Sequence, residues 1–277
     1  MIKIHVDEEV TVRFNEDAEN AFKNENDISF FDEVNGVAKV TIERWQKAQR
    51  TESKHWMELG KNANDDRNFY HLNKFKNLEY LKNYKFSHAL EIGCGPFTNL
   101  RLIANKLNIN KCSLNDPLIK TYFNHEFCSY KNQKNILLQI DNNGFLNKLF
   151  PKKLKVINFF STPFEEIVTN QKFDLIVVIN VIEHCYDIEL FFSRLLNMLS
   201  PSGVVIFEDK LYDINKLKDE VYNLYDAAHP LRVSSKIVTD FLYNNIDVLF
   251  EKIEPNSLVI ESNTFNWDDL YFVGKKR

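Results

Sequence analysis

The sequence has few cysteines, and they are not arranged in pairs. Its 277 residues include only four, which lie far apart and form no CxxC motif: Cys94, Cys112, Cys128 and Cys185. Disulfide frameworks and zinc sites need closely spaced cysteines, so we expect neither. The histidines show no ligand spacing either, and we predict no metal site. Scattered thiols are typical of a reducing compartment, which favours a cytoplasmic protein.

The sequence also lacks a basic excess and a long apolar run. Its net charge is -4 and its pI is about 6.0, far from the positive field that nucleic-acid-binding proteins use. The longest apolar stretch, residues 173–182, is too short to cross a bilayer, and the N-terminal segment has no apolar core of a signal peptide. We therefore expect a small-molecule or glycan substrate, no nucleic acid and no membrane span. The oligomeric state stays open.

The chain does contain enough apolar residues for one large domain. Hydrophobic residues make up 44% of it and charged residues 27%, which fits one α/β core with an appendage. Apolar alternation at 2–6 and 10–14 predicts two short strands in a small N-terminal appendage over residues 1–35. Residues 36–86 have a helical pattern and form a predicted cap or lid, and residues 87–277 form the predicted core.

Four residues of the predicted cap share one helix face. Trp45, Gln49, Glu52 and Trp56 recur at spacings of four, three and four. They can be two core tryptophans with a polar pair beside them. Alternatively, the helix points Gln49 and Glu52 into a ligand pocket as substrate-binding residues. The sequence leaves both interpretations open.

Residues 87–277 alternate short apolar strands with helical stretches. We predict strands at 88–92, 111–115, 156–160, 173–179 and 204–207, and helices at 99–107, 188–199, 215–225 and 235–243. Asp187 can cap the helix that follows it. The segments 248–253 and 269–273 can close the chain as a hairpin. Such alternation predicts a parallel sheet with helices on both faces.

A glycine-rich turn is the strongest local signal in the core. The sequence Glu91-Ile92-Gly93-Cys94-Gly95 leads from a predicted strand into a helix. Glycines let the backbone turn tightly and approach a ligand closely. The acid Glu91 disfavours a pyrophosphate there and suits a cationic ammonium group, bound directly or through water. A plain strand–helix turn is the alternative.

A second acid, Asp116, ends the next predicted strand roughly twenty residues after the glycines. An acid at this spacing can accept both hydroxyls of a ribose. The alternative is a helix N-cap, because Pro117 follows directly. Glu91 and Asp116 together favour a nucleoside attached to an amino acid, and S-adenosylmethionine is one.

At these residues the sequence resembles the class I S-adenosylmethionine-dependent methyltransferase superfamily. Three further motifs match in order, at residues 161–165, 180–184 and 199–203. The resemblance implies a Rossmann-like α/β fold: a seven-stranded, mostly parallel sheet with helices on both faces, an antiparallel last strand and a helical N-terminal cap. Phe97 departs from the pattern, because many members have a third glycine there.

The resemblance also implies roles for individual residues. Eight residues would bind S-adenosyl-L-methionine: Glu91, Gly93, Gly95, Asp116, Ser161, Thr162, Asn180 and Val181. Within this set, Ser161 and Thr162 would flank adenine, and Asn180 and Val181 would lie behind the sulfur.

Two histidines are candidates for a general base, which a hydroxyl acceptor needs. His184 follows the fourth predicted strand, and His229 precedes Pro230. Each has a structural alternative, as a loop-orienting histidine and as part of a turn fixed by Pro230. Arg232 is a candidate for binding an anionic substrate group, or it pairs with a surface acid.

The acceptor is predicted from a looser similarity. The Trp-x3-Gln-x2-Glu-x3-Trp arrangement resembles segments ahead of methyltransferase domains associated with bacterial surface polysaccharides. It favours O-methylation of a sugar hydroxyl in polysaccharide biosynthesis. The alternatives are an N- or C-methyltransferase of a small metabolite, a dinucleotide-binding oxidoreductase and a catalytically silent binding domain.

Overall fold

The structure, a computed structural model, describes residues 36, 38–59, 67–138, 153–213, 228–260 and 263–277. The predicted appendage with its two strands and the predicted helix at 215–225 lie outside these residues.

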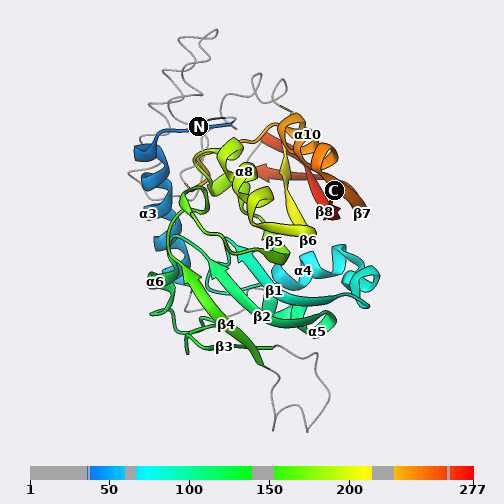
Figure 1. Ribbon diagram of the computed structural model, residues 1–277. Helices are drawn as coiled ribbons and strands as arrows, with labels where there is room; N and C mark the ends of the chain where they lie inside the picture. Colours follow the sequence, from blue (N-terminus) through cyan, green and yellow to red (C-terminus); the bar gives the residue numbers. More distant parts are fainter. Residues whose placement is uncertain (1–35, 37, 60–66, 139–152, 214–227, 261–262) are drawn as a thin grey trace.

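One mixed sheet organises the molecule (Figure 1). Its strands are β1 (Lys85–Ile92), β2 (Asn108–Asn115), β3 (Asn135–Leu137), β4 (Lys153–Phe160), β5 (Phe173–Ile179), β6 (Leu199–Leu211), β7 (Ile246–Ile260) and β8 (Asn263–Lys276). They are ordered β3-β4-β2-β1-β5-β6-β8-β7. The strands β4, β2, β1, β5 and β6 run parallel, whereas β8 is antiparallel and lies between β6 and β7. The predicted α/β fold with an antiparallel last strand is confirmed, and the short antiparallel β3 adds an eighth strand to the seven expected.

Helices cover both faces of this sheet. They are α3 (Ile42–Leu59), α4 (Arg67–Lys74), η1 (Lys76–Leu81), α5 (Leu100–Lys106), α6 (Ile119–Tyr122), η2 (Phe164–Glu166), η3 (Ile182–His184), α8 (Ile188–Met198) and α10 (Ser235–Asn245). Alternate residues of β6 enter two different cores: Val205 and Phe207 pack with α8 and α10, and Val204 and Ile206 pack with α5 and η1. This period of two is what a strand buried on both faces requires.

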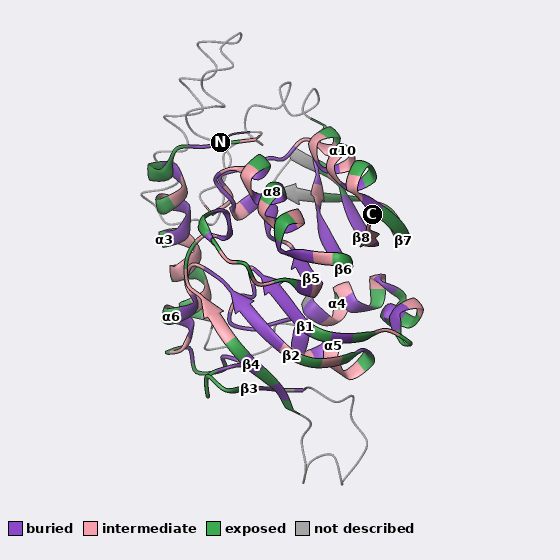
Figure 2. Cartoon of the chain, in the orientation of Figure 1, coloured by how far each residue is buried: buried purple, intermediate pink, exposed green. Residues whose placement is uncertain are grey.

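The central strands are apolar because neither of their faces meets water (Figure 2). In β5 all residues but Asp174 are buried, and its bounds are those predicted from the apolar run. Asp174 lies near the start of β5 and accepts backbone hydrogen bonds from Ser87 and His88 of β1. A continuous apolar run between helical segments is therefore a reliable signal for this strand.

The helix α3 crosses the molecule beside η3 and is held by its two tryptophans. The indole Nε1 of Trp45 donates to the carbonyl oxygen of His184 at 3.0 Å, and its ring meets Tyr186 edge-on. The ring of Trp56 packs against Phe97, with ring centroids 6.0 Å apart. Both tryptophans thus fasten α3 to loops that follow the parallel strands. None of the helices in the described ranges is long and apolar enough to cross a membrane.

Replacing Asp187 by alanine tests the start of α8. The Asp187 side chain accepts from the backbone N–H of Leu190 at 2.9 Å, as predicted for a helix cap. We expect Asp187→Ala to lower the free energy of unfolding by about 1 kcal/mol, the usual cost of a lost cap. Urea unfolding followed by circular dichroism measures this. The control is Asp240→Ala, which removes an exposed pair with Lys236 and should change stability by less than about 0.5 kcal/mol. An equal loss in both variants would contradict the capping role.

Candidate active site

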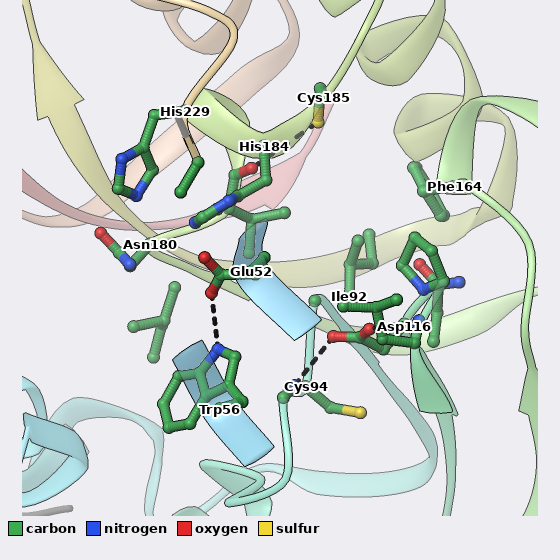
Figure 3. Close-up of a pocket in the computed structure, with 18 of the residues that line it drawn as sticks. Glu52, Trp56, Ile92, Cys94, Asp116, Phe164, Asn180, His184, Cys185 and His229 are labelled. Carbon is green, nitrogen blue, oxygen red and sulfur yellow. Dashed lines mark hydrogen bonds between the residues drawn. The ribbon is translucent and has the colours of Figure 1, made fainter. Parts of the chain in front are cut away.

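A cavity of about 600 Å³ lies where the parallel strands end, between them and α3. Its walls come from the segments after β1, β2, β4 and β5, from the end of β6, and from α3, α4 and the β7–β8 hairpin. Ligands of open α/β sheets bind at this edge, and the volume is typical of a small-molecule site. Figure 3 shows side chains from these segments pointing toward one another.

The glycine turn lies against this cavity and needs both glycines. Gly93 and Gly95 have φ angles of +63° and +51°, a region that favours glycine. A Cβ atom on Gly93 would come within 2.7 Å of the Val181 side chain, whereas a Cβ on Gly95 would meet nothing within 4 Å. Gly93 therefore allows close packing of two loops, and Gly95 leaves the backbone open to a ligand.

Glu91 is not among the residues that line the cavity. Its carboxylate accepts hydrogen bonds from Thr98, from the backbone and side chain of Asn99, and from the backbone of Leu100, at the start of α5. Burial raises the pKa of Glu91, and these donors oppose that rise. Of the two predicted ways in which Glu91 would bind a ligand ammonium, directly or through water, the structure therefore does not support direct contact. Instead, Glu91 fixes the start of the helix after the glycine turn, where backbone N–H groups attract an anion.

Asp116 does line the cavity, and it also holds the glycine turn. Its carboxylate accepts from the backbone N–H of Gly95 at 3.0 Å and of Leu118 at 2.8 Å. Asp116 is not the predicted N-cap, because Leu118 is the N-cap of α6. A carboxylate has about four acceptor positions, so two remain for a ligand. Burial raises the pKa of Asp116 to about 7.

The segment after β4 contributes different residues from those predicted. Ser161 and Thr162 are not in the cavity lining, whereas Pro163 and Phe164 are. The carbonyl oxygen of Thr162 accepts from the side-chain amide of Asn115 at 2.9 Å, which holds the segment to β2. The predicted motif at 161–165 therefore reaches the cavity through Pro163, Phe164 and Glu165.

Asn180 and Val181 lie in the cavity wall, as predicted from their position after β5. Asn180 has a φ angle of +55° and donates its backbone N–H to the carbonyl oxygen of Glu208. The backbone N–H groups of Val181 and Ile182 both donate to Asp209 at 2.7 Å. This role of Asp209 was not predicted, because the sequence around an acid in an apolar strand does not show which backbone groups it will bind. Burial raises its pKa to about 7.

His184 and His229 meet at one end of the cavity. Their ring centroids are 4.5 Å apart, and both residues line the cavity (Figure 3). Burial lowers the pKa of His184 to about 4, so its imidazole is neutral near pH 7. Its buried Nδ1 atom has no hydrogen-bond partner among the described residues. The two predicted bases, 45 residues apart in sequence, are thus brought together.

Arg232 does not reach the cavity. Its guanidinium donates to the Glu183 carboxylate at 2.8 Å, and the same carboxylate accepts from Lys210 and from the Tyr212 hydroxyl. Burial alone would raise the pKa of Glu183, but Lys210 and Arg232 hold it well below its ordinary value. The prediction of a substrate-binding Arg232 is corrected: its charge is occupied by a buried acid, because an unpaired charge there would be costly.

Gln49 and Glu52 both line the cavity, as one of the two interpretations of α3 predicts. The Glu52 carboxylate accepts from Trp56 Nε1. In the view of Figure 3, Glu52 lies between Asp116 and Asn180, next to the ring of His184. Phe97, which replaces a glycine of the pattern, packs on Trp56 and His125 and supports this helix.

Several residues of the cavity wall were not predicted. His71 of α4, Glu208 of β6, and Trp267 and Asp269 of β8 line the side next to the C-terminal hairpin. No local motif marks them; the pairing of β6 with β8 brings Glu208 near Asp269, and the pairing of β7 with β8 sets Trp267 opposite Asn256. The one available sequence signal was Glu208, an acid that directly follows the predicted apolar strand 204–207.

The sequence profile of a methyltransferase domain family, Methyltransf_23, matches residues 47–239. No curated protein sequence matches the chain. The match covers more than half of the chain, so the chain belongs to this methyltransferase domain family.

Solved structures share the fold at low sequence identity. A putative methyltransferase from Bacillus halodurans has a TM-score of 0.52 at 11% identity, covering 74% of this chain and 97% of its own. The YcgJ protein from Bacillus subtilis has a TM-score of 0.50 at 13% identity, covering 76% and 99%. The N-methyltransferase NodS from Bradyrhizobium japonicum, in complex with S-adenosyl-L-homocysteine, has a TM-score of 0.49 at 16% identity, covering 77% and 88%.

Fold and site together define a class I methyltransferase, and its cofactor is S-adenosylmethionine. The residues present fit that cofactor. Gly95 leaves open space beside the turn, and Asp116 keeps acceptor positions free in the cavity. Phe164 supplies an apolar wall in the same cavity against which the adenine ring of the cofactor could pack.

Asp116→Ala should weaken cofactor binding by roughly 10- to 100-fold, the worth of hydrogen bonds to a charged group. Calorimetric titration with S-adenosylhomocysteine measures it, with circular dichroism as the check on folding. The control Asp247→Ala removes an exposed carboxylate that pairs with Arg277, and it should leave the affinity unchanged. Equal affinity in wild type and Asp116→Ala would refute the assignment.

The stability of the cofactor-free protein should carry a signature of Asp116. Its pKa rises from 3.8 to about 7 on folding, so between these values the folded state keeps a proton that the unfolded chain has lost. The contribution of Asp116 therefore falls as the pH rises from about 4 to 7. Asp116→Asn removes this titration, and its urea midpoint should fall less over that range than the wild-type midpoint. Parallel pH dependences would contradict the raised pKa.

Proposed function

We propose that this methyltransferase transfers the methyl group of S-adenosylmethionine to a hydroxyl group of a sugar. The cofactor, when bound, supplies a methyl group that its positive sulfur already activates. The protein then has to hold the two reactants in line, exclude water and accept the proton of the hydroxyl. The observation that carries the proposal is the contact of His184 with His229 at the cavity.

Separate parts of the cavity would hold the cofactor. We assign the ribose hydroxyls to Asp116, whose carboxylate has acceptor positions left after binding Gly95 and Leu118. The open backbone at Gly95 would lie along the amino-acid end, and Phe164 would contact adenine. Asn180 and Val181 would lie behind the sulfur. Both line the cavity, and Asp209 holds their loop through the backbone N–H of Val181.

The imidazole pair is suited to take a proton from a hydroxyl. His184 is neutral near pH 7, since burial lowers its pKa, and a neutral ring has one nitrogen that accepts. The negative charge of Glu52 opposes this lowering and so favours the protonated form once a proton arrives. Glu52 would thus stabilise the imidazolium through its charge, without itself being the base.

The polar side chains of the cap favour a polyhydroxylated acceptor. Gln49 and Glu52 face the cavity from α3, and Asn256 and Asp269 face it from the C-terminal hairpin. Amide and carboxylate oxygens bind hydroxyl groups well. Trp45 of α3 and Trp267 of β8 also line the cavity, and their rings would pack on the C–H faces of a sugar.

His184→Gln and His229→Gln test the base. We expect at least one of them to lower kcat roughly 10²- to 10⁴-fold, the usual contribution of general base catalysis. The readout is transfer of an isotope-labelled methyl group to a panel of sugars, followed by mass spectrometry of the product. Affinity for S-adenosylhomocysteine should stay within about threefold of wild type.

The matched control is His88→Gln, a buried histidine on β1 that bonds Ser113 and Gln171 away from the cavity. It should change kcat little. If both cavity variants keep wild-type kcat on an accepted sugar, the pair is not the base. A product methylated on nitrogen or carbon would overturn the assignment to a hydroxyl.

A further inference from the structure

One side of the cavity is formed by the end of β6, by α4 and by the β7–β8 hairpin, and the proposed function gives it only a general role in binding hydroxyl groups. We call this side the hairpin lobe, and its residues are His71, Glu208, Lys210, Asn256, Trp267 and Asp269. In the pairing of β6 with β8, Glu208 is opposite Tyr271 and Lys210 is opposite Asp269. Since residues two apart in a strand point to the same face, Glu208 and Asp269 lie diagonally on one face of the sheet.

Glu208 has an unsatisfied oxygen in this lobe. The residue is buried, with 2% of its surface exposed, and Oε2 has no hydrogen-bond partner among the described residues. The Nδ1 atom of His71 lies 3.5 Å from it, beyond good hydrogen-bond distance. Burial, together with the negative charges of Asp209 and Asp269, raises the pKa of Glu208 well above its usual range. A positively charged donor would satisfy the oxygen and favour the ionised form.

Asp269 and Trp267 form a fixed surface beside Glu208. The indole Nε1 of Trp267 donates to Asp269 Oδ1 at 2.7 Å, and the amide of Asn256 donates to Oδ2 at 2.8 Å. Both carboxylate oxygens are therefore held in place, and the indole ring is oriented by the first of these bonds. A carboxylate beside an aromatic ring favours the binding of an ammonium group, because both the carboxylate charge and the face of the ring attract a cation.

The charge of the whole cavity points the same way. Five carboxylates line it: Glu52, Asp116, Glu165, Glu208 and Asp269. Within the described lining, Lys210 is the one lysine or arginine, and its Nζ is bonded to the buried Glu183. A phosphate or carboxylate on the acceptor would therefore find almost no positive charge in the lining, whereas a cation would favour the ionised form of these carboxyl groups.

We propose that the hairpin lobe binds a free ammonium group of the acceptor through Glu208 and Asp269, so that the acceptor is an amino sugar and not a phosphate-linked sugar. An ammonium has three donors, which suits two carboxylates and one further acceptor. The inference rests on the proposed function, because it takes this cavity as the acceptor site of a sugar methyltransferase.

Binding to the protein saturated with S-adenosylhomocysteine tests the inference without any need for turnover. The probes are glucosamine, galactosamine and mannosamine, each compared with its N-acetylated form, and glucose 6-phosphate. We expect at least one free amine to bind roughly 10-fold or more tightly than its N-acetylated form and than the phosphate, since a hydrogen bond to a charged group is lost. Calorimetry in two buffers of different ionisation enthalpy should also show proton release when the amine binds, as Glu208 ionises.

Two variants and a control locate the effect. Glu208→Gln and Asp269→Asn keep the shape of each side chain and should each remove most of the preference for the amine; Glu208→Gln should also abolish the proton release. The control Glu251→Gln changes an exposed carboxylate on β7 that bonds Tyr243, and it should keep both.

Three results would overturn the inference: no free amine binds, an N-acetylated sugar or glucose 6-phosphate binds as tightly as the amine, or the preference survives in both variants. The proposed function fails by a different observation. If methyl transfer reaches no sugar hydroxyl, O-methylation is wrong, while the amine preference is still decided by binding alone.

Discussion

The active site depends on buried carboxylates that accept backbone N–H groups at the ends of the parallel strands. Asp116 joins the glycine turn to the start of α6, Asp209 holds the loop after β5, and Glu165 accepts from the backbone of Tyr186. Loop amides at this edge are shielded from water and need partners, since a buried N–H without an acceptor is costly. The loops that line the cavity are therefore held by the protein's own side chains.

This way of holding the loops has an electrostatic consequence. Burial raises the pKa of Asp116 and of Asp209 to about 7, whereas Lys210 and Arg232 keep Glu183 ionised beneath the histidine pair. The cavity thus combines carboxyl groups that change protonation easily with a neutral imidazole, His184. A site of this kind gains most from ligands that bring positive charge or hydroxyl donors, and both the proposed function and the inferred amine follow from it.

Much of the fold could be predicted from local pattern. The apolar run at 173–179 gave β5 its bounds, and Asp187 marked the start of α8. The hairpin was predicted from two short segments, but β7 and β8 extend through the polar residues beyond them, because two edge-side strands pair through backbone hydrogen bonds whatever their side chains are. The three-residue β3 was missed, since so short a strand has no period to detect.

For the site, the sequence alone determined the motifs that local backbone geometry demands. The glycine turn, Asp116 after the second strand and the polar face of α3 are all set by spacing along one or two elements, and all reach the cavity. Only the tertiary structure decided which charges are already occupied. Glu91 is bound by the start of α5 and Arg232 by Glu183, while β6–β8 pairing brings Glu208 beside Asp269. The reason is physical: whether a buried charge is free for a ligand depends on partners that folding brings from distant parts of the chain.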